Sequence, residues 1–117
     1  MQNFSKDIKI SQLKDFLENN RYVDIQNQPL VCQSFGLPYM PSIFQSVYRK
    51  RAFEHLQDKI TTCAVVAKET GLPQKYLTWV KRNLEKKGLL YVVRIGTCPL
   101  SLRRNVQFIT TMPRDNE

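Results

Sequence analysis

The side chains best suited to chemistry lie close together in residues 73–87, PQKYLTWVKRNLEKK. At about 100° per residue along a helix, Leu77, Val80 and Leu84 fall on one side of this segment. The opposite side carries cations, a hydroxyl and an indole but no carboxylate: Lys75, Thr78, Trp79, Arg82 and Lys86. Arg and Lys donate to guanine O6 and N7 or to phosphate, and Gln74, at the start of the segment, can pair with adenine. These residues therefore favour non-covalent recognition of a polyanion.

Positive charge is concentrated in the same half of the chain. Residues 61–104 contain nine Lys/Arg and two Asp/Glu, net +7, whereas residues 1–60 contain eight and six, net +2. A basic patch on a segment that also has groove-binding geometry points to nucleic acid. A simpler alternative is a solvated helix face. Trp79 leaves three alternatives open, because it can pack under neighbouring chain, contact DNA or lie in a protein interface.

The composition argues against other classes. A single histidine, His55, and only four glycines leave no visible nucleophile–base pair and no phosphate-binding loop, so we expect no enzyme. Cys32, Cys63 and Cys98 are far apart and form no CxxC, so we expect neither a disulfide framework nor a metal, and no cofactor. With 117 residues, no long apolar run and no secretory signal, we expect one cytoplasmic domain without a membrane span.

Two helices joined by a tight turn must position the basic face. Thr61 or Thr62 can cap the first, which should end near Thr70. Gly71 suits the left-handed residue that commonly follows a helix. Pro73 then fits the first turn of the second helix, which should run to about Lys87 and end at Gly88.

A β-hairpin is expected after these helices. Residues 89–95 are β-branched and aromatic, and residues 106–111 read as the partner strand. The connection of about ten residues, 96–105, ends in Arg103-Arg104. These two arginines are therefore candidates for a second basic contact.

The chain before residue 61 is predicted to contain two helices separated by an irregular segment. Ser42 and Gln45 form a capping-box pattern that opens a helix over about 43–59. Phe44, Tyr48, Ala52 and Leu56 should form its buried stripe, while Arg49-Lys50-Arg51 is either a solvated face or a phosphate contact. We expect a helix over 11–20 capped by Ser11, and irregular packed chain with at most one strand over 21–41.

The segment GLPQKYLTWVKRNLEKKGLLYVV resembles the winged-helix DNA-binding superfamily, particularly the MarR-like and related bacterial regulators. Gly71-Leu72 matches the turn, and Leu84-Glu85-Lys86-Lys87-Gly88-Leu89-Leu90 matches the ending of the recognition helix. The resemblance covers about 43–111. It implies a mainly α fold with a small antiparallel hairpin, in which residues 42–112 form a winged helix-turn-helix. The chain departs from the family in its N-terminal extension (1–41), and we expect a frayed tail (113–117).

By this resemblance, 73–87 is the recognition helix and 96–105 is the wing. The residues implied to contact DNA are Gln74, Lys75, Thr78, Trp79, Arg82, Lys86, Arg103 and Arg104. The chain lacks the long terminal helices through which MarR-like proteins dimerise, so a homodimer stays an open alternative. No small-molecule ligand is expected.

The leading expectation is a sequence-specific double-stranded DNA-binding protein that regulates transcription. One alternative is a phage or mobile-element accessory protein that binds DNA in replication or excision. Another is a winged-helix protein-interaction module without DNA binding, which would use Trp79 and leave the cations idle.

Overall fold

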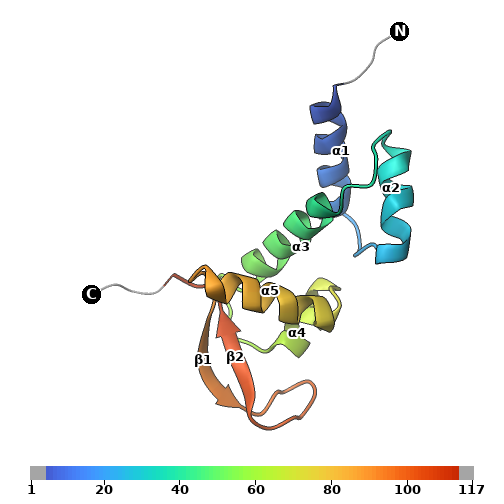
Figure 1. The fold of residues 1–117 in the computed structure, drawn as a ribbon. Coiled ribbons are helices and arrows are strands. Elements are labelled where there is room, and N and C mark those ends of the chain that lie inside the picture. The colour runs from blue at the N-terminus through green and yellow to red at the C-terminus, as the bar shows by residue number, and fades with distance from the viewer. Residues whose placement is uncertain (1–4, 114–117) are drawn as a thin grey trace. The chain divides into compact units, whose positions relative to one another are not determined.

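The computed structural model describes residues 5–113. Five α-helices, one short 3-10 helix and a two-stranded antiparallel sheet make up this part of the chain (Figure 1). The expectation of a mainly helical fold with a small hairpin is therefore confirmed. The chain divides into two compact units between Tyr48 and Arg49. Within residues 5–113, no helix combines the length and the apolar character needed to cross a membrane.

The first helix, α1, spans Lys6–Glu18, so the predicted start near Ser11 was wrong. Ser5 is the N-cap instead, and its Oγ accepts a hydrogen bond of 3.3 Å from the Ile8 N–H. A cap six residues upstream of Ser11 was available, and the apolar face tolerates the longer helix because Leu13 and Leu17 are both fully buried.

Residues 21–41 are more regular than expected. They contain a 3-10 helix, η1 (Ile25–Asn27), followed directly by a helix, α2 (Gln28–Ser34), and no strand. Pro29 lies in the first turn of α2, where its missing N–H costs no helical hydrogen bond. The polar side chain of Gln28 is buried, and it donates to the Val23 carbonyl at 3.1 Å and accepts from the Tyr39 hydroxyl at 2.9 Å. The expectation of irregular chain was therefore wrong for 25–34, where the proline begins a helix and does not interrupt one.

Helix α3 spans Pro41–His55, so it begins one residue before the predicted cap and ends earlier than residue 59. Ser42 therefore lies in the first turn, and the capping-box prediction was wrong. The predicted stripe of Phe44, Tyr48, Ala52 and Leu56 is confirmed, because all four side chains are buried. Within the first unit, the Tyr48 hydroxyl accepts a hydrogen bond of 3.0 Å from the Val23 N–H.

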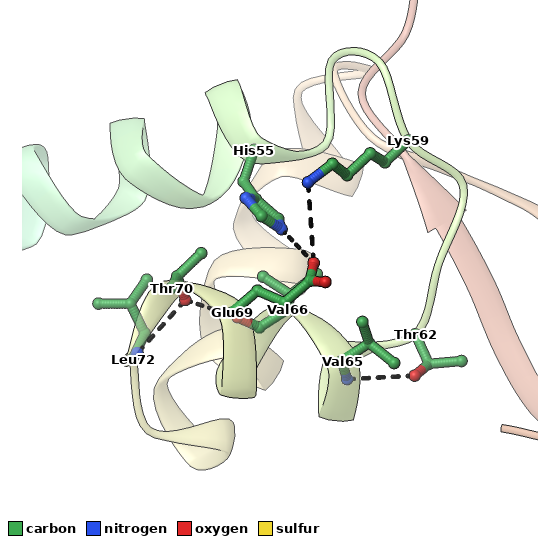
Figure 2. A network of polar contacts seen from close by, with 8 residues as sticks. All are labelled: His55, Lys59, Thr62, Val65, Val66, Glu69, Thr70 and Leu72. Atoms are coloured by element: carbon green, nitrogen blue, oxygen red, sulfur yellow. Dashed lines mark hydrogen bonds and ion pairs between the residues drawn. The ribbon is translucent and has the colours of Figure 1, made fainter. Parts of the chain in front are cut away.

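Helices α4 (Cys63–Thr70) and α5 (Gln74–Lys86) follow the prediction closely. Thr62 caps α4 by accepting from the Val65 N–H at 3.4 Å (Figure 2). Gly71 follows α4 at φ +77°, in the left-handed region that favours glycine. At the end of α5, Leu89 N–H donates to the Leu84 carbonyl at 2.9 Å, and this bond closes a Schellman motif around Gly88.

Strands β1 (Tyr91–Gly96) and β2 (Val106–Thr110) form the predicted antiparallel hairpin, with a bulge at Val93. Figure 1 shows the two strands side by side, with their connecting loop at the free end of the hairpin. A third segment pairs with β2 on its other side. There, Thr61 and Ile109 exchange backbone hydrogen bonds of 3.1 and 2.7 Å. The residues just before α4 are thereby fixed to the sheet.

Side-chain hydroxyls at the end of β2 bind the end of α3. Thr110 Oγ1 donates to the Leu56 carbonyl at 2.9 Å, and Thr111 Oγ1 donates to the Phe53 carbonyl at 2.6 Å. The last carbonyls of a helix are short of intrahelical donors, and the two threonine hydroxyls supply additional donors at this end of α3. The second unit thus has one apolar core, enclosed by the end of α3, by α4 and α5 and by the sheet. Helix α5 packs on this core through its apolar side.

Candidate nucleic-acid interface

Helix α5 has one buried side and one exposed side, as the helical spacing predicted. Leu77, Val80 and Leu84 are each at most 4% exposed. The opposite side carries five of the residues expected to meet DNA, and all are exposed: Lys75, Thr78, Trp79, Arg82 and Lys86. Gln74, at the start of the helix, is exposed as well. The core contacts of α5 therefore fix which side chains it presents to solvent.

The cations on this exposed side have no counter-ion among the residues that the structure describes. Among residues 5–113, no ion pair joins Lys75, Arg82 or Lys86 to a carboxylate. Lys81 contrasts with them, because it is half-buried and bonds Glu85 Oε1 at 2.6 Å. The single acidic residue of α5 is thus occupied, and the three exposed cations are available to an external anion.

The two uncharged polar residues differ in how free they are. Thr78 Oγ1 donates to the Gln74 carbonyl at 3.2 Å, a bond that stays within the helix. The hydroxyl oxygen and the γ-methyl can still contact a ligand. Gln74 is the first residue of α5, and its side chain is exposed.

Trp79 is exposed to 42%, a large fraction for an indole. Its ring lies 5.6 Å from that of Tyr76, centroid to centroid, and the two planes are tilted by 39°. This aromatic pair stands among the cations of α5. A flat apolar surface beside positive charge can contact the sugars and base edges of nucleic acid or an aromatic residue of a protein.

Arg103 and Arg104 lie in the loop between β1 and β2, and both are exposed. Their guanidinium groups form no ion pair within the described residues. Arg94, on β1, is engaged instead, since its guanidinium carbon lies 3.7 Å from the centroid of the Phe108 ring. A Cβ at Gly96 would approach Arg94 Nη1 to 2.9 Å, so this glycine makes room for the stacked arginine.

Cys98 ties the loop to α4. Its side chain is fully buried, and Sγ lies 3.0 Å from Oγ1 of Thr62, the N-cap of α4. Burial raises the pKa of the Cys98 thiol, but hydrogen bonds from Ser101, Thr62 and the Leu100 backbone outweigh burial and bring it down to about 7. A thiol without solvent access serves here as an anchor that sets the position of the loop.

Arg49 is engaged within the chain. Its Nη1 donates to Asn83 Oδ1 on α5 at 3.3 Å, and its side chain is half-buried. The sequence left two alternatives for the basic cluster at 49–51, a solvated face or a phosphate contact. Arg49 fits neither, because it is half-buried and bonded to Asn83. It holds α5 in place.

A polar network on α4 lies around Glu69 (Figure 2). Glu69 Oε1 is 2.8 Å from His55 Nε2 and 3.8 Å from Lys59 Nζ. The hydrogen bond with His55, followed by the nearby charge of Lys59, lowers the pKa of the Glu69 carboxyl below its ordinary value. The network joins the end of α3 to α4, and we assign it a structural role.

Sequence reasoning missed two features of this region. Thr61 pairs with Ile109, and only its position just before a helix could have hinted at a short strand. Leu102 is the second, an apolar residue in a turn directly before two arginines, exposed to 74%. Within residues 5–113, no group of three or more His, Cys, Asp or Glu side chains could hold a metal ion.

Comparisons with family models, with curated proteins and with solved structures found no match. The function is therefore argued from the geometry of this chain.

Proposed function

We propose that the second unit is a winged helix-turn-helix that binds double-stranded DNA in a sequence-specific manner and regulates transcription. The observation that carries the proposal is the exposed side of α5, where Lys75, Arg82 and Lys86 have no counter-ion within residues 5–113. An α-helix fits the major groove, where arginine and lysine distinguish guanine and where phosphates attract both.

The order of elements supports the same proposal. Helix α3, the Thr61 bridge, α4, α5 and the hairpin follow one another as in a winged helix, in which the second helix of the turn enters the groove. In this assignment, α5 is the recognition helix, and the β1–β2 loop with Arg103 and Arg104 is the wing. We propose a non-enzymatic, cytoplasmic protein that needs no cofactor.

Salt dependence of duplex binding tests the proposal. The fluorescence anisotropy of a labelled duplex is titrated at several salt concentrations. The logarithm of the affinity should fall with the logarithm of salt by about 0.9 for each phosphate neutralised. Arg103→Ala with Arg104→Ala should make this slope shallower by about two phosphates and weaken all duplexes about equally, since phosphate contacts carry little sequence information.

The matched control removes two cations from another exposed helix. Lys6→Ala with Lys14→Ala changes the net charge of the chain by the same amount, but on α1. Its salt slope should stay that of the unmodified protein. Equal slopes in both double variants would show that the loop is not at the interface. An accessory DNA-binding protein of replication or excision would give the same salt slopes as a regulator. Selection of bound sequences from a pool of random duplexes separates these two roles.

The Trp79–Tyr76 pair favours a second candidate, a protein-interaction module. Such a module would leave the cations of α5 idle. Absence of duplex binding above background at low salt would favour it over DNA binding.

A further inference from the structure

The loop between β1 and β2 carries its most exposed apolar side chain beside its arginines. Leu102 is exposed to 74%, more than any other large hydrophobic residue among 5–113. Leu100, two positions earlier, is exposed to 41%. An isolated exposed leucine needs no explanation, but this one lies in the segment that the proposed function places against DNA.

The backbone of Leu102 is in an unusual conformation. Its φ is +61°, in the left-handed region that a bulky side chain rarely adopts. Asparagine or glycine adopts this left-handed conformation at a lower energetic cost than leucine. The second residue of the loop with a positive φ is indeed an asparagine, Asn105, at φ +59°. Strained positions of this kind persist where the surroundings fix them, and they concentrate at functional sites.

Three contacts fix the position of Leu102. Its N–H donates to the Cys98 carbonyl at 2.9 Å, and the Cys98 N–H donates to the Arg103 carbonyl at 2.9 Å. The Cys98 side chain is held by Thr62 at the start of α4. The loop is therefore pre-organised, and it holds the leucine in solvent at a defined place relative to α4.

The charge around the leucine indicates what it contacts. Arg103 and Arg104 follow it directly, both exposed and without counter-ions among the described residues. A protein that bound Leu102 would also have to supply carboxylates for the two arginines. DNA already carries phosphates on both sides of each groove. Arginine is drawn into a narrow minor groove by its negative potential. Minor-groove proteins also insert leucine between base steps, which unstacks the step and kinks the duplex.

We propose that Leu102 is a wedge that enters the DNA minor groove, partly unstacks one base step and bends the duplex, while Arg103 and Arg104 bind the flanking phosphates. The proposal rests on the proposed function and deepens it. The added claim is that the loop deforms the duplex. The protein should then prefer flexible base steps such as TA and CA/TG at the site of insertion, even though it makes no hydrogen bond to those bases.

Bending is measured by fluorescence energy transfer between dyes at the two ends of a duplex of about 30 base pairs. A duplex of this length is nearly straight when free, because it is much shorter than the persistence length of ~150 base pairs. The unmodified protein should bend it by at least ~20°, the lower range for wedge insertion. Leu102→Asn removes the apolar side chain but suits the left-handed backbone. It should bend the duplex far less and bind several-fold more weakly, while its Tm stays the same or rises. Leu102→Phe should retain the bend.

The control is Leu30→Asn, which makes the same exchange at an exposed leucine on α2, 63% exposed. It should bend and bind DNA as the unmodified protein does. A bend that survives Leu102→Asn, with duplex binding intact, would overturn the wedge and leave the proposed function standing. Failure of the unmodified protein to bind any duplex would overturn both. Loss of self-association in Leu102→Asn, with unchanged bending, would assign the tip to a protein contact and also overturn the wedge.

Discussion

Arg82 and Leu84 lie two positions apart on α5 and face opposite environments. Arg82 is exposed and has no ion-pair partner among the described residues, whereas Leu84 is 3% exposed. Arg82→Ala should therefore change the free energy of unfolding by no more than about 0.5 kcal/mol, as most surface substitutions do. If Arg82 forks onto a guanine, the variant should lose about 1–3 kcal/mol of discrimination and relax the preference at one base pair. Thermal melting and a panel of single-base duplex variants measure the two effects.

Leu84→Ala is the complementary substitution. Removing a buried leucine costs about 2–5 kcal/mol of stability, because it leaves a cavity in the core. Base preference should persist in whatever fraction remains folded, since Leu84 points away from the exposed cations. Should Arg82→Ala unfold the protein, or Leu84→Ala leave its melting unchanged, the assignment of the two sides of α5 would be reversed.

Among the helices, α3 and α4 are linked by the Glu69 carboxylate, which contacts His55 and Lys59. The pKa of Glu69 is lowered from the ordinary 4.5, first by the hydrogen bond with His55. A carboxyl whose pKa is lower in the folded than in the unfolded chain stabilises the fold above its unfolded pKa. That contribution is lost as the pH falls below 4.5 and through the still lower folded pKa.

Glu69→Gln should therefore destabilise the protein near neutral pH, and the difference in Tm should shrink as the pH is taken below 4.5. The effect should be small and should weaken with salt, because the Glu69 side chain is 45% exposed. Glu54→Gln, at an exposed position on α3, serves as the control and should leave the pH profile of the Tm unchanged. A difference between Glu69→Gln and the unmodified protein that stays constant down to strongly acidic pH would contradict this account.

At the scale of the whole molecule, the unit boundary at Tyr48–Arg49 falls inside α3, whereas the sequence suggested a domain start at residue 42. The first half of α3 supplies Phe44 and Tyr48 to the core of the first unit, where the Tyr48 ring lies 4.8 Å from that of Tyr22. Residues 5–41 are thus part of a core of their own, because they bury the first half of α3 through contacts such as Tyr39 with Phe44.

A fragment of residues 42–117 should show this dependence. Phe44 and Tyr48, each 1% exposed in the full chain, would meet water. Exposing large apolar side chains costs about 1.5–3 kcal/mol each, so we expect the fragment to self-associate. Phe44→Gln with Tyr48→Gln in the same fragment should restore a monomer, measured by sedimentation velocity. A monomeric unsubstituted fragment with the Tm of the full chain would refute this role for residues 1–41.

The elements that depend on short-range signals could be predicted from the amino-acid sequence alone. Thr62, Gly71 and Gly88 act within one helical turn, and each caps or ends the predicted helix. The repeat of Leu77, Val80 and Leu84 placed the buried side of α5, and therefore its basic side, correctly. Local hydrogen bonds and helical periodicity are properties of a few neighbouring residues, so the sequence exposes them directly.

The remaining features could be located only in the folded chain, because the contacts that produce them join residues far apart in the sequence. Thr61 forms an isolated β-bridge with Ile109, and the Arg49 side chain is held by a hydrogen bond to Asn83. Leu102 adopts a left-handed backbone against its own preference because Cys98 and Thr62 hold the loop. Local propensity gives the opposite expectation for such a residue. Its conformation and its exposure beside two arginines therefore became visible only once the loop had been placed.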